Sequence, residues 1–234
     1  MQNPYEILVV DPGLSLPETE AFNRMSKSSK IPLTYHLPNF TGCGSLFRTP
    51  PETIAGVVLF GSNASVHDHR PWQAELMSWL RSEIIDRKIP IFGICFGHQL
   101  LHLMLGGQVD YVHESKKLEI GKRTIQLQAD PCLDIKNTKG EVFVYHSEQV
   151  TRVGSGFANW AKGDFIPHEA SYHTEFPIWT IQSHPEGTAA DCKEFQVDPN
   201  SFSNLFGWSI VDSFLDFCNL NMLDKSKFLK KREY

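Results

Sequence analysis

The chain has 234 residues, of which 41% are hydrophobic and 21% are charged, and its formal net charge is −5. This length suits one sizeable α/β domain over residues 1–234, and the composition is that of an ordinary soluble protein. The mild negative charge gives no electrostatic reason to expect nucleic acid or an anionic membrane surface as a partner.

The cysteine content argues for a reducing compartment. The chain contains five cysteines, an odd number, and no two of them are spaced as C-x-x-C. A disulfide framework or a thiolate zinc site is therefore not expected. The N-terminus "MQNPYEILVV" has no basic segment followed by a long apolar core, and the apolar runs are shorter than the roughly 20 residues that span a bilayer. We expect a cytoplasmic protein without a signal peptide.

The first half of the chain predicts alternating strands and helices. Compact apolar runs indicate buried strands, and Pro71 is suited to the first position of a helix. The strands are expected at residues 7–10, 31–37, 54–60 and 89–94, and the helices at 18–28, 71–87 and from the bend near residue 95 to Leu105. Strands that are apolar on both faces and alternate with helices favour a mainly parallel sheet covered on both sides.

The second half has a different character. Strands are predicted at residues 122–128, 141–145 and 178–182, with few helical signals between them, and a final amphipathic helix is predicted at 202–217. We therefore expect an α/β fold with an open mixed, mainly parallel sheet flanked by helices and an added antiparallel section. The basic tail "KSKFLKKREY" is interpreted as a solvated C-terminus.

The stretch "GICFGHQL" places Cys95 where a predicted strand turns sharply into a helix. At such an elbow the apical side chain is pushed out at the carboxyl edge of the sheet, and the nearby Gly93 and Gly97 relieve the crowding. The N-terminus of the following helix favours a thiolate, and the amide of Phe96 can face a developing oxyanion. The alternative is a buried structural cysteine beside a tight turn.

A cysteine nucleophile needs a base and a group that orients this base. The segment "IWTIQSHPEG" supplies His184 at the end of a predicted strand, with Glu186 two residues later. Since both Cys95 and His184 leave carboxyl ends of strands, where open α/β sheets place their sites, we expect them to meet. Glu186 would accept a hydrogen bond from the imidazole and hold its tautomer.

These motifs resemble the class I glutamine amidotransferases, whose pattern is G-x-C-x-G-x-Q followed much later by H-P-E. "GICFGHQLLHLMLGG" and "IQSHPEG" carry the resemblance, "VVLFGSNASVHD" is similar to the oxyanion strand and loop of the family, and "YHSEQV" to its His-x-Asp-x-Val segment. Within this family, the chain resembles the amidotransferase domain of GMP synthase and stand-alone proteins like it. The resemblance implies a flavodoxin-like fold and no cofactor.

The resemblance also implies roles for individual residues. Cys95 attacks the glutamine amide and forms a glutamyl thioester, His184 protonates the leaving ammonia and then activates water, and Glu186 orients His184. The amides of Phe96 and of the Gly61–Ser62 turn form the oxyanion hole. Gln99 and the segment His146-Ser147-Glu148 hold the amino-acid end of the substrate.

Two residues depart from the family pattern. Ser62 replaces the second glycine of the oxyanion loop, and Glu148 stands where aspartate is common. Serine keeps the N–H that the oxyanion hole requires, so we expect the hole to survive. The longer side chain of Glu148 is expected to shift recognition of the α-amino group, or to admit γ-glutamyl compounds other than glutamine.

Two histidine patterns raise the question of a metal site. His98-Gln99-Leu100-Leu101-His102 imitates the H-E-x-x-H zinc helix, but glutamine stands in place of the general base. His67-Asp68-His69 has ligand-type side chains and is interpreted as a solvated loop. No metal is expected at either place.

The resulting prediction is a glutaminase that delivers ammonia to a separate acceptor, and its candidate partner is a separate synthetase subunit. One alternative with the same residues is a γ-glutamyl peptidase that acts on glutathione-like substrates. A second alternative, from another class, is a catalytically silent regulatory homologue.

Overall fold

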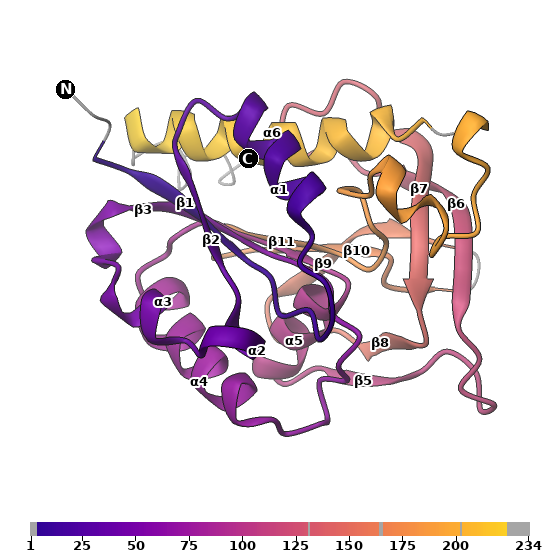
Figure 1. Cartoon of the computed structure of the whole chain (residues 1–234), viewed down its shortest axis with the longest axis horizontal. Helices are drawn as coiled ribbons and strands as arrows, with labels where there is room; N and C mark the ends of the chain where they lie inside the picture. The colour runs from indigo at the N-terminus through magenta and orange to yellow at the C-terminus, as the bar shows by residue number, and fades with distance from the viewer. Residues whose placement is uncertain (1–3, 131, 164–165, 202, 224–234) are drawn as a thin grey trace.

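The computed structural model describes residues 4–130, 132–163, 166–201 and 203–223. A nine-stranded sheet runs through the molecule (Figure 1). From one edge to the other it contains β2 (Leu33–His36), β1 (Glu6–Val10), β3 (Ile54–Leu59), β4 (Ile91–Ile94), β11 (Ile178–Ile181), β10 (Ala170–His173), β9 (Phe157–Lys162), β6 (Glu119–Leu127) and β7 (Lys139–His146).

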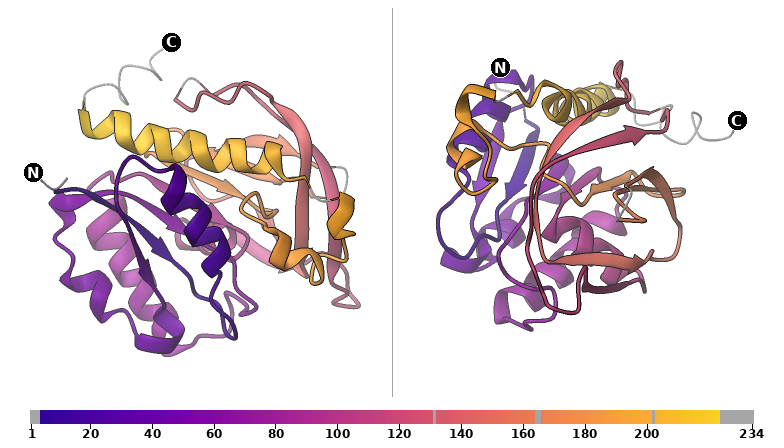
Figure 2. Two further views of the ribbon diagram at one scale, coloured as in Figure 1. Left: turned by 45° about the horizontal axis from the view of Figure 1, so that its top comes forward. Right: turned by 90° about the vertical axis from the view of Figure 1, so that its right-hand side faces the viewer.

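The sheet has a parallel and an antiparallel part. β2, β1, β3, β4 and β11 pair in parallel, whereas every pair from β11 to β7 is antiparallel. The sheet curls at the antiparallel end, which two further views make visible (Figure 2). A separate two-stranded ribbon pairs β5 (Gln108–Tyr111) with β8 (Glu148–Arg152). The mixed α/β fold is confirmed, with a larger antiparallel section than three predicted strands implied.

Helices cover both faces of the parallel part. α1 (Thr19–Ser28) and α6 (Leu205–Leu223) lie on one face, and α2 (Pro38–Thr41), α3 (Gly44–Arg48), α4 (Pro71–Trp79) and α5 (Phe96–Met104) lie on the other (Figure 1). Short helical turns occupy Pro51–Thr53, Ala189–Cys192 and Pro199–Ser201. Along β1, Ile7 and Val9 belong to one core and Leu8 and Val10 to the other. This two-sided burial explains the unbroken apolar run of the strand.

Two predicted helices need correction. The helix expected over 71–87 is α-helical only to Trp79 and continues as a π-helical segment, Leu80–Ile85, in which the hydrogen bonds span one residue more. The last helix begins at Leu205 rather than at 202, and position 202 lies outside the described residues, as does the basic tail. Strands β5, β8, β9 and β10 were not predicted.

Gly97 allows α5 to pack closely on β3. A Cβ atom at this position would lie 2.4 Å from the backbone carbonyl oxygen of Leu59 and 2.9 Å from its Cγ. Because a backbone carbonyl in a central strand cannot move aside, Gly97→Ala is expected to lower the free energy of unfolding by about 2 kcal/mol. Urea denaturation would measure the change.

Gly44→Ala is the matched control for this prediction. It also adds one methyl group near the start of a helix, but the single heavy atom recorded near its Cβ is the mobile guanidinium end of Arg48, at 3.2 Å. We expect its unfolding midpoint to match that of the wild type. Equal midpoints for Gly97→Ala and Gly44→Ala would contradict the close packing of α5 on β3.

Candidate active site

Cys95 is the apex of the elbow between β4 and α5. Its backbone has φ = 49° and ψ = −100°, a conformation that non-glycine residues rarely adopt. A hydrogen bond of 2.8 Å from the Cys95 amide to the Ile181 carbonyl ties the elbow to β11. The Sγ atom lies 3.8 Å from the carbonyl oxygen of Tyr145. The predicted strand–turn–helix bend at Cys95 is present.

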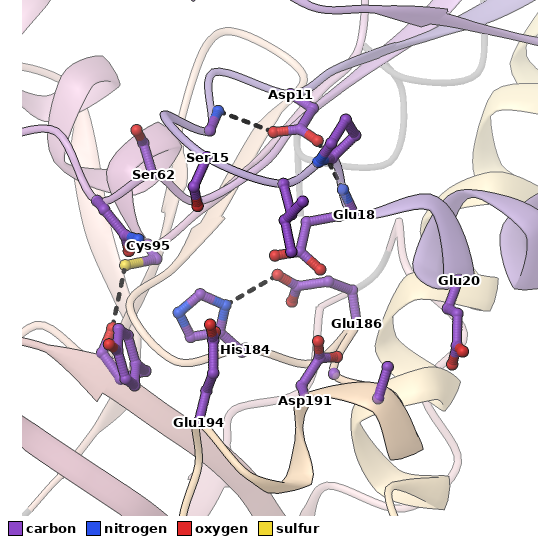
Figure 3. A pocket seen from close by; sticks show the side chains of 18 of the residues that line it. Asp11, Ser15, Glu18, Glu20, Ser62, Cys95, His184, Glu186, Asp191 and Glu194 are labelled. Atoms are coloured by element: carbon purple, nitrogen blue, oxygen red, sulfur yellow. Dashed lines mark hydrogen bonds and ion pairs between the residues drawn. The ribbon is translucent and has the colours of Figure 1, made fainter.

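His184 follows the carboxyl end of the neighbouring strand β11. Its amide donates to the carbonyl of Phe143 at 2.8 Å, which fixes the backbone of the base against β7. The imidazole Nδ1 lies 2.9 Å from Oε1 of Glu186, and Nε2 has no hydrogen-bond partner among the described residues. Figure 3 shows the ring between the Cys95 sulfur and the Glu186 carboxylate. The two groups that were expected to meet therefore do so.

The loop from Pro185 to Gly187 is anchored from α6. Asn204, immediately before this helix, donates its side-chain amide to the carbonyls of Pro185 and Gly187, at 2.8 and 3.0 Å. This double contact holds the segment that carries Glu186. Asn204 is buried. It lies far from the H-P-E motif in the sequence, so no local pattern predicted this contact.

The charge state of His184 follows from two neighbours. Burial of the imidazole by itself would lower its pKa, but the Glu186 carboxylate and the sulfur of Cys95 outweigh burial and hold the pKa well above its usual value. The imidazolium form is therefore favoured at neutral pH. A protonated His184 is a proton donor beside the sulfur.

The residues predicted to form the oxyanion hole are Gly61, Ser62 and Phe96, and Gly61 lies close to both Cys95 and His184. A Cβ atom at Gly61 would lie 2.8 Å from Cε1 of His184 and 3.4 Å from Cβ of Cys95, so a side chain there would collide with the ring. The Ser62 hydroxyl donates to the carbonyl of Pro12 at 2.8 Å and accepts from the amide of Ala64 at 3.0 Å. These two hydrogen bonds hold the loop in place. A glycine at position 62, as in the family pattern, has no side chain to form them. Phe96 is the first residue of α5, where helices leave the N–H without an intrahelical acceptor.

The residues predicted to bind the substrate line one cavity, which also reaches Cys95. This cavity has a volume of about 490 Å³, and Gln99, His146, Ser147 and Glu148 are among its lining residues. Oε1 of Glu148 accepts a hydrogen bond of 2.7 Å from Ser65. Burial lowers the pKa of His146 to about 3, and its Nδ1 contacts the Glu148 carbonyl at 2.9 Å, so the ring is neutral.

Gln182 is a part of this site that was not predicted. Its side-chain amide lies 3.7 Å from the Cys95 sulfur and 3.2 Å from the amide of Gln99. Its position two residues before His184 could have predicted this, because alternate residues of a strand lie on the same face. Ser65, which holds Glu148, lies in the quoted "VVLFGSNASVHD" segment but was not singled out.

A second cavity also reaches Cys95. Its volume is about 400 Å³, and Cys95, His184 and Glu186 line it together with the loop after β1. Figure 3 shows several acidic side chains around it, among them Asp11, Glu18 and Asp191. The sequence had suggested only a turn at Asp11, although an acid at the carboxyl end of a central strand was a usable signal.

The buried histidines of α5 have structural contacts. His98 Nδ1 lies 2.8 Å from the Thr180 hydroxyl, and the Gly154 amide donates to His102 Nδ1 at 3.1 Å. Within the described ranges, no group of three or more His, Cys, Asp or Glu side chains is placed to hold a metal ion. None of the five cysteines forms a disulfide. No helix in the described part of the chain has the length and apolar character needed to cross a membrane.

Sequence comparison identifies similar proteins of one family. The sequence model of the family "Glutamine amidotransferase class-I" matches residues 42–195. The chain is 36% identical over 133 residues to the GMP synthase [glutamine-hydrolyzing] of Streptococcus mutans, which covers 56% of this chain and 24% of that protein. It is 31% identical over 170 residues to the enzyme of Streptococcus thermophilus, covering 72% of this chain and 30% of that protein. The chain thus spans less than a third of the length of these relatives.

Solved structures share the fold over almost the whole chain. A putative GMP synthase subunit from Thermoplasma acidophilum superposes with a TM-score of 0.71 and 19% identity, covering 95% of this chain and 98% of the other. A glutamine amidotransferase from Thermotoga maritima superposes with a TM-score of 0.70 and 18% identity, covering 95% and 99%.

Proposed function

Because the chain belongs to the class I glutamine amidotransferase family, we propose that it hydrolyses the side-chain amide of glutamine through a glutamyl thioester on Cys95. One observation carries the proposal: His184 uses Nδ1 to bind Glu186 and keeps Nε2 unpartnered, among the described residues, beside the sulfur. This is the arrangement that a nucleophile, a base and an orienting group require.

The first half of the reaction transfers the glutamyl group to sulfur. The Cys95 thiolate attacks the amide carbon, and the oxygen takes up the negative charge beside the amides of Phe96 and the Gly61–Ser62 turn. The Nε2–H of His184 then passes its proton to the amide nitrogen, the C–N bond breaks, and ammonia leaves. The products of this half are the thioester, a neutral imidazole and ammonia.

The second half regenerates the enzyme. Neutral His184 takes a proton from water, and the resulting hydroxide attacks the thioester carbon. The C–S bond breaks to give the thiolate and a γ-carboxylic acid, which releases its proton to solvent as glutamate leaves. Glu186 stays hydrogen-bonded to Nδ1 throughout and balances the positive charge of the imidazolium. Gln99, His146, Ser147 and Glu148 are proposed to hold the α-amino and α-carboxylate groups in the cavity that they line.

The ammonia acceptor is proposed to belong to a separate synthetase subunit, with residues 1–234 acting as one amidotransferase domain. Support comes from the matched GMP synthases, which extend well beyond the part that this chain covers, and from a structural neighbour described as a GMP synthase subunit. The test measures ammonia and glutamate release from glutamine with and without a candidate synthetase. Failure to release glutamate in either condition would contradict the proposed function.

A γ-glutamyl peptidase is the second candidate, and one observation favours it. The cavity of about 400 Å³ that His184 and Glu186 line offers space for a leaving group larger than ammonia. Comparing glutamine with γ-glutamyl dipeptides as substrates separates the two candidates.

Replacing Glu186 by glutamine is expected to lower kcat/KM for glutamine by about 100-fold and to change its pH profile. The Glu186 carboxylate is the strongest influence that raises the pKa of His184, so its loss lowers that pKa. Since the imidazolium is the acid that protonates the leaving amide nitrogen, activity falls as pH rises through this pKa. The alkaline limb of the kcat/KM profile should therefore move to lower pH.

Glu52→Gln is the control for this change, because Glu52 is exposed and precedes the amino end of β3, away from the site. Its pH profile should superpose on that of the wild type. An alkaline limb that stays in place in Glu186→Gln would contradict the assigned role of the carboxylate.

A further inference from the structure

The two cavities meet at Cys95 and differ in what lines them. Cys95 and Tyr145 line both, but only the smaller cavity contains His184 and Glu186. The larger one contains Gln99 and Glu148. The reacting carbonyl carbon of a γ-glutamyl group must lie at the sulfur, where the two cavities meet. The glutamyl chain and the leaving nitrogen are attached to opposite sides of this carbon, so each points into a different cavity. If the amino-acid end enters the larger cavity, the leaving group faces the smaller one.

Proton transfer requires the same orientation. The proton that the leaving nitrogen receives comes from Nε2 of His184, and His184 lines the smaller cavity but not the larger one. Ammonia would occupy only a small part of its volume of about 400 Å³. An amine that carries a chain of several atoms would extend along the loop from Gly13 to Glu20 that forms one wall. We call this space the amine cavity.

Acidic side chains dominate the amine cavity. Its lining includes six acids, Asp11, Glu18, Glu20, Glu186, Asp191 and Glu194, and the basic side chains His184 and Lys193. Of the ion pairs that described residues form, only His184–Glu186 involves one of these acids. The other five acids therefore have no ion-pair partner within the described part of the chain.

Two of the acids are already occupied by structural hydrogen bonds. Asp11 accepts from the amides of Gly13 and Glu18 and from the hydroxyl of Tyr35. Asp191 accepts from the amide and hydroxyl of Thr188. They contribute charge, whereas a ligand needs a carboxylate with a free oxygen.

Glu186 and Glu18 supply free oxygens. Glu186 is only 4% exposed, and its Oε2 has no hydrogen-bond partner among described residues, although Oε1 binds His184. The side chain of Glu18 points toward Glu186 (Figure 3), and the carboxyl group of Glu18 forms no hydrogen bond or ion pair among described residues. Burial and repulsion from Asp191 and Glu186 raise the pKa of Glu18 to about 8. A cation between these carboxylates would relieve that repulsion and satisfy the unpartnered oxygen.

We propose that the amine cavity binds the leaving amine of a γ-glutamyl amide and selects amines with a second, positively charged nitrogen, as in a diamine acylated at one end. This proposal rests on the proposed function and names its substrate class. Cys95 displaces the amine, the C–N bond breaks, the amine leaves with the proton of His184, and water cleaves the thioester to give glutamate. The distal ammonium stays charged throughout and contacts Glu18 and Glu186.

The test compares four γ-glutamyl compounds with wild-type enzyme: glutamine, γ-glutamyl-1,4-diaminobutane, γ-glutamyl-pentylamine and γ-glutamyl-4-aminobutyrate. The last three have similar length and differ in the charge at the end, which is positive, neutral or negative. We expect kcat/KM for the cationic amide to exceed that for the neutral one by about tenfold or more, and the anionic amide to be the poorest. Added salt should reduce the differences.

Glu18→Gln tests the wall directly. The carboxyl group of Glu18 forms no ion pair among described residues, so the change keeps the shape of the wall and removes the group that a bound cation would hold ionised. The ratio of kcat/KM for the cationic to the neutral amide should fall several-fold, whereas Glu52→Gln, at the opposite end of the sheet, should keep the wild-type ratio. Equal ratios in Glu18→Gln and wild type would overturn the assignment.

The outcomes separate the two proposals. In one outcome, the enzyme hydrolyses glutamine and either hydrolyses the three amides at equal rates or does not hydrolyse them. This would overturn the proposed role of the amine cavity and leave the proposed function standing. Failure of the wild type to hydrolyse glutamine or any of the amides would overturn both. A preference for the anionic amide would also contradict the proposal.

Discussion

Cys95→Ala is expected to abolish glutamine hydrolysis, with a loss of about 10⁴-fold or more in kcat. The variant removes the sulfur that forms the thioester. The groups that contact this sulfur are the side-chain amide of Gln182 and the backbone carbonyl of Tyr145, and neither is a nucleophile that could replace it. The fold should survive because the elbow is held by the backbone bond from residue 95 to Ile181. Glutamate release and the thermal unfolding midpoint would be measured together.

Cys43→Ala is the matched control for the nucleophile. Cys43 is also buried and free, but it lies in the core on the face of the sheet opposite α6, and its sulfur contacts the carbonyl of Trp72 at 3.6 Å. This variant should retain turnover. A γ-glutamyl diazo-ketone should label the wild type and Cys43→Ala but not Cys95→Ala. Full turnover by Cys95→Ala would discard the mechanism, and an unlabelled, inactive wild type would favour a catalytically silent homologue.

His184→Ala is expected to lower kcat by about 10³-fold, because both proton transfers lose their donor and acceptor. The substitution leaves a gap beside the amine cavity, so added imidazole should restore part of the activity. A residue with a purely structural role would show no such rescue. Steady-state kinetics with increasing imidazole would measure it.

His69→Asn is the control for this prediction. His69 is exposed and has φ = 53°, a conformation that asparagine also adopts readily. Its kcat should equal that of the wild type with and without imidazole. An unchanged kcat in His184→Ala would contradict the assigned proton transfers.

The parts of the site that the sequence could predict are those with a local signature. The glycines around Cys95 predict a tight bend. His184 and Glu186 are two residues apart in the sequence, so the contact between these two side chains is nearly local. The parallel strands could be found because burial on both faces makes them continuous apolar runs. These features need little information from distant parts of the chain.

The missed parts depend on distant partners. β9 and β10 are short strands with mixed sequences, "FANWAK" and "ASYH", and their conformation follows from the strands beside them. Glu18 looked like the start of a weak helix, and only the fold brings it opposite Glu186. The π-helical segment after Trp79 has no marker of its own in the helical spacing.

One strand, β7, is a common reference for the whole site. Phe143 holds the backbone of His184, Tyr145 turns its carbonyl to the Cys95 sulfur, and His146 begins the segment that lines the larger cavity. β7 is also the last strand of the curled antiparallel edge. The position of the proton donor and the position of the cavity that Gln99 and Glu148 line therefore depend on the same strand. A substitution that displaces β7 should disturb proton transfer and substrate binding together.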